Sequence, residues 1–243
     1  MGLFSLTQEL AIDLGTANTL IIHNGKVVVD EPSIVALDVH TGKLVAIGTQ
    51  ARQMHEKTNP NIKTIRPLKD GVIADFNATE LMLRGMIKKV KTSGNLFAPS
   101  IRMVICIPSG STNVEIRAVR DSAEHAGGRE VYMIYEPMAA ALGAGLDVEA
   151  PEGHMVVDIG GGTTDVTVFY KNSVRHVGIV PMGGNAINRD IRSYGILERH
   201  VESLKVRYGS AMRDQIKTEM SIKTPGLNAR MPKEISLLNL AAI

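Results

Sequence analysis

Residues 156–163 read VVDIGGGT, and residues 10–16 carry a similar pattern, LAIDLGT. In each segment an apolar run ends in an aspartate, which is followed by an apolar residue, glycine and then a small or hydroxyl-bearing residue. Strand-forming residues resume after each turn, so each segment predicts a β-hairpin closed by glycine and threonine. The repetition favours a duplicated α/β domain with a cleft between its halves.

Composition and charge restrict the class of protein further. The chain has 243 residues, of which 44% are hydrophobic and 21% charged, an ordinary globular mixture that excludes wholesale disorder. A net charge of +2 and an aromatic content of 4% give no indication of a nucleic-acid partner. The lone cysteine, Cys106, lies in the apolar run IRMVICIP and predicts a reduced, cytoplasmic protein. No stretch is long and apolar enough to cross a bilayer, and the N-terminus lacks the features of a secretory signal.

The segment between the two glycine turns predicts alternating strands and helices. A strand over 101–110 precedes a helix over 112–127, and VYMIYEP leads into a helix of small residues, MAAALGAG. Residues 31–70 predict a more irregular insert with several prolines. An amphipathic helix follows, and two further helices are expected over 185–194 and 197–208. The apolar face of the amphipathic helix is expected to carry Leu81, Leu83, Ile87 and Val90.

Both glycine turns have the composition of phosphate-binding loops, because glycine lets backbone N–H groups approach a phosphate closely. We expect the turns to face each other across the cleft. No G-x-x-x-x-G-K-[ST] motif occurs, which excludes a P-loop enzyme, and the Rossmann fingerprint G-x-G-x-x-G is absent too. The expected donors are Gly15, Thr16, Ala17 and Asn18 in the first turn, and Gly160, Gly161, Gly162, Thr163 and Thr164 in the second.

Three carboxylates complete the expected site. Asp13 and Asp158 precede the turns, where they suit a Mg²⁺ ion held through its waters. Glu136 stands before Pro137 at the end of a strand, where a carboxylate can orient or deprotonate an attacking water. The alternative for Glu136 is a carboxylate stabilised at a helix N-terminus, without a catalytic role.

Five segments in this order resemble the MreB family, bacterial actin-like proteins that organise cell-wall synthesis: AIDLGTANTLI, DEPSIVAL, IRPLKDGVIADF, EPMAAALGAG and MVVDIGGGTTDV. The resemblance covers residues 1–167. It implies an α/β fold of the actin/hexokinase/Hsp70 type, which is ribonuclease H-like, with duplicated domains. The first domain would span 1–145 with the insert 31–70. The second would span 146–243, beginning with 146–182 and continuing as a smaller subdomain over 183–243.

The same resemblance implies a site for ATP and Mg²⁺ and slow ATP hydrolysis coupled to filament formation. Glu136 would be the catalytic carboxylate, and Thr163 would help to hold the attacking water. Lys205 matches the lysine that actin-like proteins place near the sugar and base of the nucleotide. Gly183 and Gly184 would belong to the same nucleotide site.

The resemblance also implies a peripheral position at the inner membrane, reached through apolar side chains. Leu3 and Phe4 would form an N-terminal tip, and Leu96 and Phe97 a nearby loop. The alternative for these residues is ordinary packing within the protein. The implied partners are further copies of the chain in a filament, the membrane surface and membrane proteins of cell-wall elongation, with no nucleic acid.

From about Val168 onward the sequence resembles FtsA, an actin-like division adapter, in VFYKNSVRHVGIVPMGGNAINRDI and the residues that follow. This favours a join between the two families at the shared glycine loop. About a third of an actin-like fold would follow residue 243, so the second half is expected to be incomplete. The alternative functions are therefore a division adapter or an inactive truncated fusion.

Overall fold

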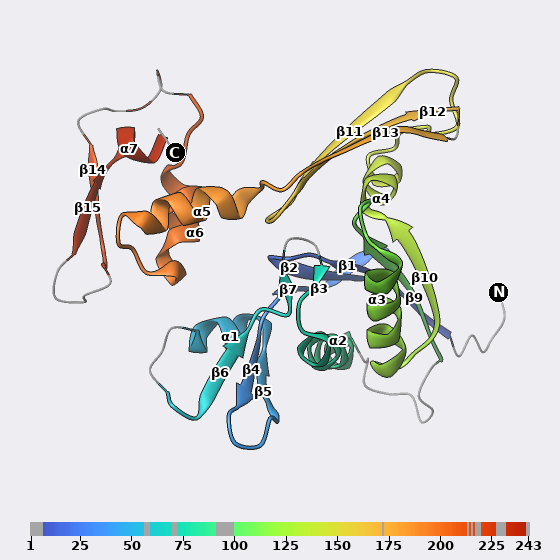
Figure 1. Ribbon diagram of the computed structural model, residues 1–243, viewed down its shortest axis with the longest axis horizontal. Coiled ribbons are helices and arrows are strands. Elements are labelled where there is room, and N and C mark those ends of the chain that lie inside the picture. The colour runs from blue at the N-terminus through green and yellow to red at the C-terminus, as the bar shows by residue number, and fades with distance from the viewer. Residues whose placement is uncertain are drawn as a thin grey trace. The chain divides into compact units, whose positions relative to one another are not determined.

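The computed structural model describes residues 7–55, 59–69, 72–90, 100–171, 173–212, 214, 216, 220–226 and 232–241. The chain divides into two compact units, 1–181 and 182–243 (Figure 1). Each unit combines helices with β-strands, which confirms the expected mixed α/β class.

A five-stranded sheet forms the centre of the first unit, with the order β10-β9-β1-β2-β3. The antiparallel neighbours β1, β2 and β3 are joined by tight turns, whereas β9 and β10 run parallel to β1. This confirms the first predicted hairpin. The strands are β1 (Thr7–Leu14), β2 (Asn18–His23), β3 (Lys26–Pro32), β9 (Ser100–Ile107) and β10 (Gly128–Tyr135).

Two helices, α2 (Phe76–Val90) and α3 (Asn113–His125), lie side by side and complete the main hydrophobic core (Figure 1). Successive side chains of β1 point to opposite faces of the sheet, so Leu10, Ile12 and Leu14 all point into this core. The prediction that Leu81 lies on the buried face of α2 is wrong, because Leu81 is only half-buried. With 3.6 residues per turn, positions 79, 82, 86 and 90 lie along one face of the helix, and this is the face that α2 buries. The side chains that α2 buries are Ala78, Thr79, Met82, Leu83, Met86, Ile87 and Val90.

The predicted helix over 112–127 begins and ends almost where the sequence indicates. Thr112 caps α3 by accepting a hydrogen bond from the backbone N–H of Glu115, and the Glu115 carboxylate accepts one from the backbone N–H of Thr112 at 2.7 Å. This reciprocal capping box fixes the start of α3 directly after the loop that follows β9.

The insert over 31–70 is more regular than predicted. It contains a three-stranded antiparallel sheet in the order β5-β4-β6, from β4 (Val35–Asp38), β5 (Leu44–Ile47) and β6 (Ile62–Ile65). Helix α1 (Gly48–Met54) packs on this sheet around a small core with Ile34 and Ala51. The short pair β7 (Leu68–Lys69) and β8 (Val72–Ile73) then leads back to α2.

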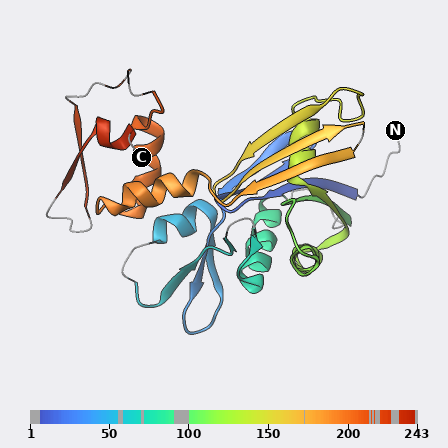
Figure 2. The same ribbon diagram turned by 45° about the horizontal axis from the view of Figure 1, so that its top comes forward.

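The second predicted hairpin is also confirmed. Strands β11 (His154–Ile159), β12 (Thr164–Tyr170) and β13 (Ser173–Val180) form an antiparallel sheet, drawn in yellow to orange in Figure 2. Its strands are not hydrogen-bonded to the five-stranded sheet. Helix α4 (Glu136–Gly143) packs on β11 and β12, where Ala141 and Met138 meet the fully buried Phe169. The start of α4 therefore lies close to the turn between β11 and β12.

The second unit is built around α5 (Gly184–Ser193) and α6 (Glu198–Tyr208), and these bounds confirm the two predicted helices. A hairpin of β14 (Ser221–Thr224) and β15 (Lys233–Ser236) follows, and α7 (Leu237–Ala241) follows β15. These elements share a separate core that contains Ile191, Val201, Leu204, Ile235 and Leu240.

Candidate functional site

The first unit contains a cavity of about 490 Å³ at the place where its two glycine turns come together. Both turns and the start of α4 contribute to its walls, and strands of the five-stranded sheet supply the rest. Of the described residues that line it, none is basic. The lining residues are Ala11, Ile12, Asp13, Gly15, Thr16, Ala17, Asn18, Leu20, Ile22, Cys106, Glu136, Ala139, Ala140, Asp158, Gly160, Gly161, Gly162 and Thr163.

The first turn is held in place by a side chain that the sequence analysis does not single out. The hydroxyl of the buried Ser33, just after β3, donates a hydrogen bond to the carbonyl oxygen of Gly15 at 2.6 Å. The backbone N–H of Ser33 donates to the carbonyl oxygen of Ala17 at 2.8 Å. Because the Ser33 hydroxyl has one hydrogen, the buried Thr19 must be the donor in its 2.9 Å bond to Ser33. These bonds occupy two carbonyl groups of the turn.

Both turns fold back tightly on themselves. A Cβ atom on Gly15 would lie 2.7 Å from the carbonyl oxygen of Asn18, closer than a real Cβ can approach. In the second turn the N–H of Gly160 donates to the carbonyl oxygen of Thr163 at 2.9 Å. Thr164 is the first residue of β12, where it pairs with Ile159, and is not among the lining residues.

Helix α4 presents one face to the cavity. Glu136, Ala139 and Ala140 are spaced as neighbours on a helix surface, and all three line the cavity. The two alanines leave room beside the Glu136 carboxylate, while Pro137 favours a helix start at this point. The small-residue segment of the sequence thus forms part of the cavity wall.

Four carboxylates, those of Asp13, Glu136, Asp158 and Asp165, gather at this end of the unit. Burial, followed by the charges of Asp13, Asp158 and Asp165, raises the pKa of Glu136 to about 8. Asp13 faces the cavity, but the surrounding protein displaces enough water to raise its pKa, and the charge of Asp158 adds to this effect. The site therefore holds concentrated negative charge.

Such a set of oxygen donors fits a hard divalent cation, because a cation would offset the repulsion between the carboxylates. Within the described part of the chain, no three His, Cys, Asp or Glu side chains converge closely enough to ligate one ion. A Mg²⁺ ion at Asp13 and Asp158 would therefore be held partly through water, as Mg²⁺ prefers.

Cys106 forms part of the cavity wall beside these carboxylates. Burial and the charges of Asp13, Glu136 and Asp158 raise the pKa of its thiol to about 12. Since the thiolate is the reactive form, this cysteine is a poor nucleophile at neutral pH.

The remaining described residues of the expected nucleotide site belong to the second unit. Gly183 precedes α5 and Gly184 begins it. The ammonium group of Lys205 lies 3.4 Å from the carbonyl oxygen of Gly184 and 2.9 Å from the carboxylate of Glu202. Asn188 donates to the same Glu202 oxygen at 2.7 Å, so Lys205 is part of a polar cluster between α5 and α6.

The expected membrane contacts are not described by the structure. Leu3, Phe4, Leu96 and Phe97 all lie outside the described residues. Over the residues that it does describe, no helix combines the length and apolar character needed to span a bilayer.

Comparison with known proteins places the chain in a family. The family model described as MreB/Mbl protein matches residues 7–241. The chain belongs to the MreB/Mbl family. The chain is 42% identical to the cell shape-determining protein Mbl of Bacillus subtilis over 238 residues, which are 95% of this chain and 71% of that protein. It is 45% identical to the cell shape-determining protein MreB of Escherichia coli, over 97% of this chain and 71% of that protein.

Solved structures give the same MreB-type fold. MreB5 of Spiroplasma citri bound to ADP superposes with a TM-score of 0.84 at 33% identity, covering 97% of this chain and 73% of that one. The same protein bound to AMPPNP gives a TM-score of 0.82 at 32% identity. The MamK double helical filament shares the fold at 18% identity, with a TM-score of 0.74. The expected actin-like architecture is confirmed.

The MreB/Mbl match continues through residues 168–241, which the sequence analysis compares with FtsA. The resemblance to FtsA and the join at the glycine loop are not confirmed. An MreB-like actin homologue is therefore favoured over a division adapter.

Proposed function

We propose that this MreB/Mbl family member binds ATP with Mg²⁺ in the cavity of the first unit and hydrolyses it slowly. We further propose that copies of the chain assemble into filaments at the inner-membrane surface that guide cell-wall synthesis and cell shape. The observation that carries the proposal is the cavity itself, in which two glycine turns face Asp13, Glu136 and Asp158.

The lining residues would have different roles in binding and hydrolysis, according to their chemistry. Backbone N–H groups of Gly15–Asn18 and Gly161–Thr163 would bind the phosphates, since the N–H of Gly160 already donates to the carbonyl oxygen of Thr163. Asp13 and Asp158 would hold Mg²⁺ through water, and the ion would supply positive charge against the phosphates. Glu136, whose pKa is raised to about 8, would accept a proton from the attacking water, with Thr163 beside it.

The descriptions of the relatives and the nucleotides bound in their structures support the proposal. Two structures of the MreB5 relative contain ADP and AMPPNP, which supports a nucleotide in this chain. The Mbl and MreB relatives are described as cell shape-determining, which supports the cellular role. Roles for Gly183, Gly184 and Lys205 at the nucleotide, and contact with cell-wall elongation proteins, rest on the family resemblance.

Thermal melts with and without Mg-ADP test nucleotide binding. Ligand at 100 times its dissociation constant stabilises a protein by about 2.7 kcal/mol, so we expect a shift of several degrees. Asp158→Asn should abolish most of the shift. Glu149→Gln, which removes an exposed carboxylate outside the cavity, is the matched control and should keep it. No shift in the unaltered chain would refute the proposal.

Sedimentation tests the two assembly claims separately. With Mg-AMPPNP, the chain should enter the pellet at high speed above a critical concentration. With vesicles that contain anionic lipid, it should float with the lipid, and serine at Leu3, Phe4, Leu96 and Phe97 should leave it in the soluble fraction. Unchanged flotation of the quadruple variant would refute the assignment of these residues.

A further inference from the structure

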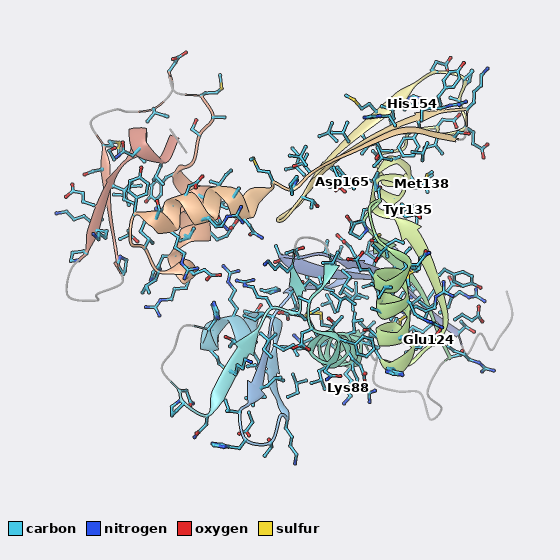
Figure 3. The ribbon with its side chains drawn as sticks, in the orientation of Figure 1. Lys88, Glu124, Tyr135, Met138, His154 and Asp165 are labelled. Carbon is cyan, nitrogen blue, oxygen red and sulfur yellow. The ribbon has the colours of Figure 1, made fainter. Side chains whose placement is uncertain are left out.

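Residues 30–34, which we name the connector, run from the end of β3 to the start of β4. The chain leaves the five-stranded sheet at Pro32 and enters the sheet of β4, β5 and β6 at Val35 (Figure 1). In Figure 3 the labelled Lys88 marks α2, the helix that contacts β3, β4 and β5. The connector thus passes directly from the sheet that carries the first glycine turn to the sheet of the insert.

Two side chains of the connector bond to the first glycine turn. The hydroxyl and the backbone N–H of Ser33 donate to the carbonyl oxygens of Gly15 and Ala17, at 2.6 and 2.8 Å. The carboxylate of Asp30 accepts a hydrogen bond from the side-chain amide of Asn18 at 3.2 Å. Gly15, Ala17 and Asn18 all line the cavity. The connector is therefore bonded to the part of the turn that would hold phosphate.

Two other residues of the connector bond to the start of α1. The Glu31 carboxylate accepts hydrogen bonds from the backbone N–H and the hydroxyl of Thr49, at 2.7 and 2.8 Å, and pairs with Lys89 of α2. The carbonyl oxygen of Ile34 accepts a hydrogen bond from the backbone N–H of Gly48 at 2.9 Å. The side chain of Ile34 is fully buried in the small core of the insert. The connector therefore fixes where α1 begins.

Bonds to the turn and bonds to α1 alternate along five consecutive residues. Ser33 and Ile34 are adjacent and fully buried, so neither can move without displacing the other. Pro32 lies between Glu31 and Ser33, and its ring fixes φ at about −65°, which leaves the connector one soft torsion fewer. A loosened turn must therefore loosen α1, and a firmly held turn must hold α1 in place.

We propose that the connector couples nucleotide binding at the first glycine turn to the order of α1 and the insert, with Glu31 as a positioning residue. The inference rests on the proposed function and deepens it, since it adds regulation to the same site. A nucleotide that orders the turn reduces the motion of Ser33, and through the connector that of Glu31. Coupling of this kind requires no change of shape. It is reciprocal, so loosening Glu31 must weaken nucleotide binding.

Four variants separate this coupling from a general loss of stability. Ser33→Ala removes the hydroxyl bond to the turn, and Glu31→Gln weakens the bonds to α1 and α2. Ser122→Ala is the control for Ser33, because Ser122 is a fully buried serine of α3. Glu80→Gln is the matched control for Glu31, because Glu80 is also a carboxylate paired with a basic residue of α2, at a similar exposure of 22% against 18%. The described partners of Glu80 are Arg84 and His125, both outside the connector.

The first readout needs no nucleotide. Hydrogen exchange followed by NMR measures the opening of the Gly48 and Thr49 N–H groups, which bond to the connector. Ser33→Ala should speed their exchange about fivefold, the lower end of typical coupling between sites, and Ser122→Ala should not. The internal reference is the N–H of Val39, just beyond the far end of β4, which donates to the carbonyl oxygen of Asn61 at 2.9 Å. Unchanged exchange at Gly48 and Thr49, or equal acceleration at Val39, would overturn the coupling.

The second readout is the affinity for Mg-ADP, measured by isothermal titration. Glu31→Gln should weaken binding about fivefold although it lies outside the cavity lining, and Glu80→Gln should leave binding unchanged. In a Ser33→Ala background, Glu31→Gln should lose most of its effect, because the two residues act through one connector. An unchanged affinity in Glu31→Gln, or equal losses in both backgrounds, would overturn the proposal. Absence of Mg-ADP binding in the unaltered chain would refute the proposed function instead, and the exchange result would still decide whether turn and α1 are coupled.

Discussion

Asp158 of β11 and Asp165 of β12 are direct register partners, so their carboxylates share one face of the sheet that packs against α4. Like charges in this arrangement repel each other, and burial, followed by the charge of Asp158, raises the pKa of Asp165. Glu136 and Asp13 add to the same cluster from other elements. This cluster of acids should make the free energy of unfolding of the ligand-free protein depend on pH.

Glu136 should make the stability of the ligand-free protein depend on pH. Its pKa is raised from 4.5 to about 8, so between these values the folded state binds a proton that the unfolded state releases. The free energy of unfolding should therefore fall as the pH rises through this range. In Glu136→Gln this part of the fall should disappear, which makes the variant more stable than the unaltered chain above pH 8.

Urea melts at several pH values, without nucleotide or divalent cation, measure this effect. Glu124→Gln is the control, since it removes an exposed carboxylate of α3 outside the cavity. If Glu136→Gln gained no stability relative to the unaltered chain as the pH rose, the burial and charge repulsion assigned to Glu136 would be wrong.

Ser33→Ala should loosen the first glycine turn. The change leaves the carbonyl of Gly15 and the hydroxyl of Thr19 without their partner, at a cost of about 1–2 kcal/mol in the free energy of unfolding. It should also weaken Mg-ADP binding, because the turn is then less firmly held. Ser122→Ala is the control: Ser122 is fully buried in α3, its hydroxyl has no partner among the described residues, and its loss should cost nothing. Equal destabilisation by the two changes would contradict the anchoring role of Ser33.

Gly15→Ala should weaken nucleotide binding in the cavity more than it lowers the free energy of unfolding. The new Cβ would overlap the carbonyl oxygen of Asn18, so the turn must shift and Mg-ADP binding should weaken by about an order of magnitude. Gly143→Ala at the end of α4 is the contrast, since a Cβ there meets nothing within 4 Å and should add up to about 1 kcal/mol of stability. Isothermal titration and urea melts give both quantities, and an unchanged affinity in Gly15→Ala would count against a phosphate loop here.

Glu31→Gln should loosen the attachment of the insert to the rest of the first unit. Both the backbone N–H and the hydroxyl of Thr49 donate to the Glu31 carboxylate, at 2.7 and 2.8 Å, and Lys89 of α2 pairs with it. Burial opposes ionisation, but the bonds from Lys89 and Thr49 outweigh it and lower the pKa of Glu31. Its contribution to stability is thus present above pH 4.5 and lost as the pH falls below that value.

The expected size is about 1 kcal/mol at neutral pH, since the group is partly solvated. Lys89→Gln removes the ion pair while leaving the bonds to Thr49, so it should cost less. Urea melts of both variants and the unaltered chain at neutral and acid pH measure these differences in the free energy of unfolding. If the loss in Glu31→Gln were as large at acid pH as at neutral pH, the role assigned to the ionised carboxylate would be wrong.

The sequence predicts the two hairpins, α3, α5 and α6 well, because periodicity, capping residues and glycine punctuation are local signals. It predicts the insert poorly, since strands as short as Val35–Asp38 carry too few residues for a clear period. The error at Leu81 has a similar origin: Met82 and Met86 are buried in its place, and the phase of a helix is fixed only by the surface it packs on.

For the candidate site, the sequence indicates the turns and the carboxylates, and the structure brings those of the first unit to one cavity. Ser33 is missed because its bond to Gly15 joins residues 18 positions apart through a side chain, which no local pattern reports. Asp165 stands within the quoted segment MVVDIGGGTTDV, and strand alternation places it on the inward face opposite Asp158. A buried acid at an inward position of a strand is the signal that could have identified it.

The Glu31 carboxylate also sets limits on how this fold can change during evolution. Gly48 begins α1 at a φ of +58°, and a Cβ there would overlap the same carboxylate that accepts the bonds of Thr49 and pairs with Lys89. A larger residue at position 48 therefore requires that the side chain at 31 shift or be replaced and that the backbone leave the left-handed region. Loss of that acid in turn leaves the lysine at 89 without this counter-charge. Across the family we expect positions 31, 48 and 89 to co-vary.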